Sequence, residues 1–260
     1  MLGFMIRIAS FFAALVAATL ALPAAAILTR SDRDDEEYRE LATRYPAAVG
    51  LGIAAGTGTL IAPRWLLTSA RAASTLRSSR DPLRLAGRLV EVQEILVHPD
   101  WRPGEEADIA LLFLREPVTG LEPVDTYRSS DEAAQTARIV SHGETGRIGS
   151  LPGQRKTDGL ARAAINTVDR VAARTLGMRI KGPEDASDLQ GALVDTDTGA
   201  PAFFEVGGRT WVAGIASRPG EWETYVRVSA FAAWIEEAMF RVAMQEAARD
   251  EQTRKRKVLP

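Results

Sequence analysis

Residues 56–73 read GTGTLIAPRWLLTSARAA, in which two short apolar runs are separated by Pro63 and Arg64. Similar short apolar runs, bounded by Gly, Pro, Asp or Ser, follow one another along most of the chain up to Val228. Many short strands with turn signals between them are typical of a β-sandwich or a β-barrel. The sequence therefore predicts an all-β fold.

The C-terminal segment departs from this strand pattern. Its apolar residues recur at the spacing of one helical face: Phe231, Ile235, Met239 and Val242. Ser229 precedes them at a position suited to an N-cap. We expect a helix over residues 229–250 whose apolar face docks on the β body. Residues 251–260 then form a basic tail that we expect to be solvated, with contact to an anionic surface as the alternative.

Composition limits the possible functions. The 260 residues carry 32 basic and 34 acidic side chains, a formal charge of −2, whereas nucleic-acid-binding domains normally carry a basic excess. We therefore expect no nucleic-acid partner. The chain has no cysteine, which excludes disulfides, Cys-based zinc sites and a Cys nucleophile. Its two histidines, His98 and His142, and its scattered carboxylates show no metal-ligand spacing, so we expect no metal and no other cofactor.

The first 26 residues have the pattern of a secretory signal peptide. Arg7 precedes an apolar run from Ile8 to Leu22, and the alanines that end at Ala26 have the small-residue form of a signal-peptidase site. Cleavage near Ala26 predicts a secreted or periplasmic protein that begins at Ile27. The alternative is an uncleaved membrane anchor, because residues 8–28 are about as long as the roughly 20 residues that a spanning helix needs.

Three segments, taken in order, carry recognisable motifs. They are GTGTLIAPRWLLTSARAA (56–73), HPDWRPGEEADIALLFLREPV (98–118) and DTDTGAPAFFEVGGRTWVAGIAS (195–217). They resemble the segments around the base histidine, the aspartate and the nucleophile of trypsin-like (chymotrypsin-fold, peptidase family S1) serine proteases. The resemblance implies two packed six-stranded antiparallel β-barrels, followed by a C-terminal helix. Residues 27–130, with a charged lead-in, would form the first barrel and residues 131–228 the second.

The resemblance places Arg71, Asp108 and Thr198 at the three catalytic positions, in the order base, aspartate and nucleophile. In such enzymes an imidazole accepts the proton of the attacking hydroxyl, which is not ionised near neutrality. The Arg71 guanidinium stays protonated and has no lone pair that could accept a proton. Neither histidine lies at the base position, so we expect no peptidase activity. We expect the Arg71 side chain to form a bidentate ion pair with Asp108 instead.

The resemblance also implies an oxyanion hole and a buried N-terminus. The hole would be made by the backbone N–H groups of Thr196 and Thr198. Position 196 is glycine in the family, and a β-branched residue there predicts a distorted hole. The ammonium group of a freed Ile27 would pair with Asp197, and the alternative is that Asp197 hydrogen-bonds only within its own turn.

These observations favour an exported serine-protease homologue without peptidase activity, which binds a protein or peptide. The resemblance places its primary pocket at Ala192 and Ser217, with no evident carboxylate at the base and therefore no expected preference for basic side chains. One alternative is an active endopeptidase in which a nearby serine, Ser69 or Ser217, contributes. Another is a membrane-anchored interaction module that retains residues 8–28; otherwise we expect no membrane contact. The sequence predicts no oligomeric state.

Overall fold

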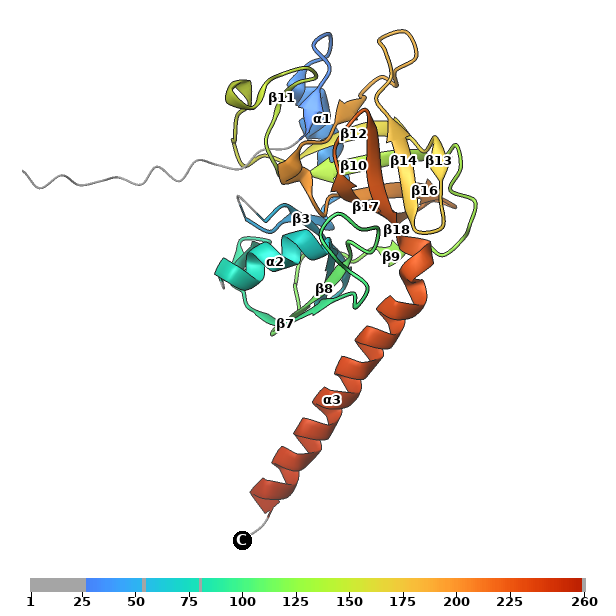
Figure 1. Cartoon of the computed structure of the whole chain (residues 1–260). Helices are drawn as coiled ribbons and strands as arrows, with labels where there is room; N and C mark the ends of the chain where they lie inside the picture. The colour runs from blue at the N-terminus through green and yellow to red at the C-terminus, as the bar shows by residue number, and fades with distance from the viewer. Residues whose placement is uncertain (1–26, 53–54, 80, 259–260) are drawn as a thin grey trace, which may run out of the picture.

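The computed structural model describes residues 27–52, 55–79 and 81–258 (Figure 1). The predicted signal peptide, residues 1–26, lies outside this range. Two β bodies are stacked, and a long C-terminal helix runs from the second body past the first (Figure 1). The predicted all-β class with a C-terminal helix is confirmed, and the two β bodies correspond to the two barrels that the resemblance implies.

The first β body is built on a five-stranded antiparallel sheet. Its strand order is β2-β3-β4-β8-β7, and the hairpin β5-β6 forms a separate two-stranded sheet. The elements are β2 (Ala48–Gly50), β3 (Thr57–Ala62), β4 (Trp65–Thr68), α2 (Ala70–Ser79), β5 (Leu83–Leu85), β6 (Arg88–Val90), β7 (Val92–Val97) and β8 (Ala110–Leu114). All residues of β4 and β8 are buried, because both strands have neighbours on each edge and are almost wholly apolar.

The second β body is a larger sheet of eight strands. Its order is β12-β10-β16-β17-β18-β14-β13, and β9 pairs in parallel with β17. The strands are β9 (Asp125–Thr126), β10 (Thr136–Ser141), β12 (Arg162–Thr167), β13 (Arg170–Val171), β14 (Thr175–Arg179), β16 (Pro201–Val206), β17 (Arg209–Arg218) and β18 (Trp222–Arg227). The hairpin between β16 and β17 turns at Gly207 and Gly208, whose φ angles of 61° and 73° explain the need for glycine.

The charged lead-in packs on the second β body, although the sequence analysis grouped it with the first. Strand β1 (Leu28–Thr29) pairs with β11 (Gly146–Arg147) and β15 (Gly191–Ala192). Helix α1 (Asp35–Ala42) then buries Tyr38, whose hydroxyl donates to the carbonyl oxygen of Gln190 at 2.9 Å. One aromatic side chain thus anchors a segment most of whose charged side chains face solvent.

The C-terminal helix α3 spans Ala232–Val258 and follows a short 3-10 helix, η3 (Val228–Phe231). Its predicted apolar face docks as expected, with Ile235 and Val242 buried in the core. The N-cap prediction is wrong, because Ser229 lies within η3 and its hydroxyl donates to Glu132 Oε1 at 2.6 Å. The helix also continues through most of the predicted tail, since arginine, lysine, glutamine and glutamate are good helix formers.

One apolar cluster joins the two β bodies and α3. Leu67 and Ile109 enter it from the first body, Phe203 and Val226 from the second, and Ile235 from α3. This shared core fixes the two bodies against each other and positions the loops at their junction. Within the described ranges, no helix is both long and apolar enough to cross a bilayer.

Candidate active site

The structure brings the three predicted catalytic positions together at the junction of the β bodies. Arg71 lies in the first turn of α2, Asp108 precedes β8, and Thr198 follows the 3-10 helix η2 (Asp195–Asp197). The backbone N–H of Arg71 donates to Asp108 Oδ1 at 2.9 Å, and its Nε donates to Thr198 Oγ1 at 3.2 Å. The three residues therefore form one connected group.

The predicted bidentate ion pair between Arg71 and Asp108 is wrong. The two carboxylate oxygens of Asp108 accept from the Arg71 backbone N–H and from Ser217 Oγ, the latter at 2.8 Å. Because the backbone of Arg71 is already hydrogen-bonded to the Asp108 carboxylate, the long Arg71 side chain reaches past this carboxylate. The guanidinium instead donates through Nη2 to the carbonyl oxygen of Ser217 at 2.7 Å, and its Nη1 lies 3.8 Å from the exposed Asp195 carboxylate.

The hydroxyl of Thr198 contacts no base. Its Oγ1 lies 2.7 Å from Ser69 Oγ, and the other group bonded to it is the Arg71 guanidinium. Ser69 precedes α2 and its Oγ accepts the backbone N–H of Ala72 at 3.0 Å, as an N-cap residue does. A guanidinium and a hydroxyl thus surround the nucleophile position, and neither accepts a proton readily near neutrality.

The two histidines have other surroundings. The His98 ring packs against Phe231 and Trp234, with ring centroids 5.0 Å apart in each case, and its Nδ1 accepts the backbone N–H of Asp100. His142 packs closely against Gly50. Burial lowers the pKa of His142 to about 4, so this imidazole is neutral near pH 7. Neither ring is hydrogen-bonded to Thr198 or Asp108 among the described residues.

The structure also brings Ile27 and Asp197 together. The backbone nitrogen of Ile27 donates to Asp197 Oδ1 at 3.4 Å, while Ser141 Oγ and the Val194 N–H donate to the same carboxylate at 2.6 Å and 2.8 Å. Asp197 is fully buried, and burial raises its pKa to about 6. A Cβ on Gly143 would lie only 2.3 Å from Asp197 Oδ1, so this approach requires glycine. The carboxylate is held from several sides and not only by its own turn.

Thr196 is held by the turn that follows β10. Its Oγ1 accepts the backbone N–H of Glu144 at 2.8 Å, and the Asp197 N–H closes the η2 turn onto the carbonyl oxygen of Val194 at 2.9 Å. The β-branched side chain therefore has a defined place next to the Asp197 carboxylate. An oxyanion hole at the N–H groups of Thr196 and Thr198 stays a prediction.

Comparison with known protein families agrees with this arrangement. A family model described as Trypsin matches residues 35–235, which include both β bodies and the three catalytic positions. The chain belongs to the trypsin family. The match ends early in α3, so most of this helix lies beyond the part of the chain that the trypsin model covers.

A buried carboxylate that the sequence motifs did not indicate lies beside the predicted primary pocket of this trypsin-family chain. Glu223 accepts the N–H of Leu193, which follows Ala192, and also the Tyr225 hydroxyl at 2.8 Å and the Asn166 amide at 3.4 Å. Burial raises the pKa of Glu223 to about 8. One signal was present in the sequence: Glu223 and Tyr225 alternate in β18, which places both on its buried face.

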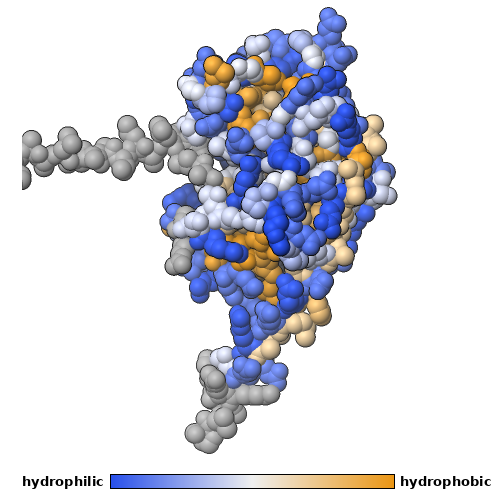
Figure 2. Space-filling view, in the orientation of Figure 1, coloured by the Kyte–Doolittle hydropathy of each residue, from blue (hydrophilic) through white to orange (hydrophobic). Residues whose placement is uncertain are grey.

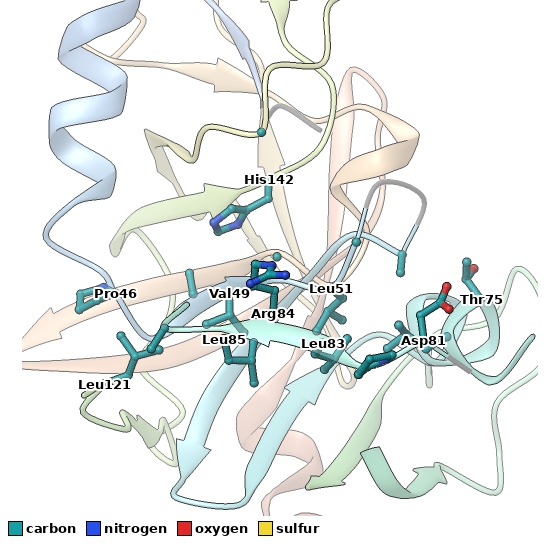
Figure 3. A pocket seen from close by; sticks show the side chains of 18 residues that line it. Pro46, Val49, Leu51, Thr75, Asp81, Leu83, Arg84, Leu85, Leu121 and His142 are labelled. Carbon is teal, nitrogen blue, oxygen red and sulfur yellow. The ribbon is translucent and has the colours of Figure 1, made fainter. Parts of the chain in front are cut away.

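Two of the hollows beside α2 share Thr75 in their lining. The smaller, about 520 Å³, is lined by Arg71, Asp108 and Trp101 among others. The larger, about 760 Å³, is mainly apolar, and Figure 3 shows its leucine side chains gathered on one side with His142 on the other: Leu51, Leu83, Leu85 and Leu121. Among the described residues, no three His, Asp or Glu side chains are grouped in a way that could hold a metal ion.

Proposed function

We propose that this trypsin-family protein does not hydrolyse peptides and acts by binding a protein or peptide at the junction of its β bodies. The observation that carries the proposal is the Arg71 guanidinium, which donates to Thr198 Oγ1 and to the carbonyl oxygen of Ser217. A donor that cannot deprotonate occupies the place where hydrolysis requires a proton acceptor. In one enzyme with a comparable triad, loss of the base or the nucleophile lowers turnover by about 10⁶.

The hollows beside α2 support a binding role. The larger one has a mainly apolar lining, in which Leu121 is partly exposed and suits an apolar side chain of the ligand, and the smaller one offers the partly exposed Arg71 guanidinium. Because both hollows share Thr75, an extended peptide that crosses the first turns of α2 contacts both. The ligand class that fits is therefore a polypeptide with one apolar anchoring residue.

We expect no hydrolysis of a denatured, dye-labelled protein and no labelling by a serine-directed phosphonate. On the same protein, we expect retention by an immobilised peptide library, lowered at least tenfold by Leu121→Asp at the edge of the larger hollow. Leu151→Asp, at an exposed leucine outside both hollows, is the matched control. Phosphonate labelling of Ser69 or Ser217 would instead support the active alternative, and equal retention of both variants would contradict binding in the larger hollow.

We also propose that the mature protein begins at Ile27 and is secreted or periplasmic. Cleavage after Ala26 converts the Ile27 nitrogen, 3.4 Å from Asp197 Oδ1, into an ammonium group that gives this buried carboxylate a cation. N-terminal sequencing of the exported protein should start at Ile27. Its α-amino group should resist acetylation until the protein unfolds, because Ile27 is buried. Recovery of the full leader in the membrane fraction would support the anchored alternative.

A further inference from the structure

The last turns of α3 are not buried against the body of the described chain. The last anchor is Arg64, whose guanidinium donates twice to the Glu246 carboxylate, at 2.8 Å and 3.1 Å. Beyond Glu246, every side chain from Ala247 to Arg254 is exposed, and Figure 1 shows this part of the helix projecting from the body. A helix that buries no face is only marginally stable in water. Burial of this exposed face against a partner would stabilise these turns.

An apolar stripe marks the uncovered face. Phe240 is 67% exposed and Met244 is 56% exposed, although both belong to the most apolar stretch of α3. They lie on the side of the helix opposite the buried Ile235 and Val242, and Ala247 continues the stripe toward the free end. Figure 2 shows hydrophobic surface along the start of this helix. The exposed stripe therefore faces away from the body that carries it.

One charged residue lies at each end of the same stripe, and these two residues indicate the kind of partner. Glu237 precedes the apolar residues and Arg254 follows them at the spacing of the stripe, and neither forms an ion pair within the described chain. A lipid surface would have to bury the Glu237 carboxylate without a cation, which disfavours a membrane as the partner. A second helix that carries cations at one end and acids at the other satisfies both groups. α3 is itself such a helix.

We propose that α3 binds α3 of a second copy of this chain in antiparallel orientation. In one register, Glu237 of each copy faces Arg254 of the other, and Met244 of each copy faces Ala247 of the other, since both pairs are centred between Gln245 and Glu246. Phe240 then lies over the aliphatic stem of Glu251. An apolar centre is bounded by an ion pair at each end, whereas a parallel pairing sets like charges against each other. The two bodies lie on the outer sides, so neither obstructs the other.

The absence of cysteine from the sequence makes disulfide trapping a direct test of this register. Glu237→Cys and Arg254→Cys are made as separate full-length variants, and each is oxidised alone and as an equal mixture. The mixture should give a disulfide-linked dimer, and neither variant alone should do so, because equivalent positions are 17 residues, or about 25 Å, apart along the antiparallel pair. Linkage of either variant to itself, or no linkage in the mixture, would overturn the proposal.

Exchange of the charges tests the same contact without a covalent bond. Glu237→Arg and Arg254→Glu should each raise the dimer dissociation constant at least tenfold in sedimentation equilibrium, and the combined variant should return to within about threefold of the parent. Phe240→Ser/Met244→Ser should also abolish the dimer, whereas Leu151→Ser, with an equally exposed side chain, should not. A monomer at all concentrations, including one that binds vesicles of anionic phospholipid, would contradict the proposal.

Discussion

Arg71→His combined with Thr198→Ser is expected to give peptide hydrolysis at least about 10³ times faster than any background of the parent protein. The aspartate of the triad is already in position, because Asp108 is bound by the backbone N–H of residue 71 and by Ser217 Oγ. An imidazole at position 71 would be attached to the same backbone, next to Asp108. Replacing arginine by histidine also removes the guanidinium that now donates to the carbonyl oxygen of Ser217. The full 10⁶ of a complete triad is not expected, because Thr196 stands at the position predicted for the oxyanion hole, where the family has glycine.

The single variants test whether both substitutions are needed for hydrolysis. Arg71→His alone leaves a threonine hydroxyl at the nucleophile position, and Thr198→Ser alone leaves a donor in place of the base, so both should stay silent in the same dye-release assay. Adding Asp108→Ala to the active double variant should remove the gain. If the double variant keeps the thermal stability of the parent and still shows no hydrolysis or phosphonate labelling, substitution of the two positions is not a sufficient explanation for inactivity.

The family motifs predicted the fold and the positions of the site, because each motif is one continuous stretch of sequence. The run from residue 56 to residue 73 forms β3, β4 and the first turn of α2, and the periodic apolar residues of α3 dock as their spacing predicts. The full length of α3 was not predictable from this pattern. The last residues of α3 show no apolar residues at helical spacing. Only their high helix propensity, and the lack of a proline in this stretch before Pro260, favour a helix there.

Contacts between distant segments were not predictable in the same way. The motifs placed Arg71 and Asp108 near each other, but the direction of a long side chain depends on which acceptors the second β body offers, here Thr198 and Ser217. Glu223 is a stronger case, because its partners Asn166 and Leu193 lie 57 and 30 residues away in sequence. Burial of that carboxylate is a property of the folded sheet, and the alternation in β18 was its only local sign.

Glu223→Gln is expected to remove most of the pH dependence of stability above about pH 6. Burial raises the pKa of Glu223 from an ordinary value of 4.5 to about 8, so the folded state holds this proton more tightly than the unfolded state does. The stabilisation is fully present below pH 4.5 and is lost as the pH rises through 8. The loss from pH 4.5 to pH 8 is on the order of 5 kcal/mol for 3.5 pKa units, of which about 2 kcal/mol falls above pH 6.5 and should appear as a falling free energy of unfolding in urea titrations of the parent.

Glutamine preserves the contacts that matter for this comparison. Its amide oxygen still accepts the Leu193 N–H and its NH₂ group can donate to the Tyr225 hydroxyl. The Asn166 amide loses its 3.4 Å contact but keeps its 2.9 Å bond to the carbonyl oxygen of Gly191, so the fold keeps its shape while the titrating group is lost.

Asp197 also has a raised pKa, but its value of about 6 confines its effect to lower pH. The α-amino group of a freed Ile27, which ordinarily titrates at about pH 8, is common to the parent and the variant, so the difference between their slopes from pH 6.5 to 9 reports Glu223. Glu116→Gln, at an exposed glutamate, should retain the full slope of the parent. A parent protein whose unfolding free energy is flat across that interval would show that Glu223 is charged in the folded state, and therefore that a cation or water reaches it.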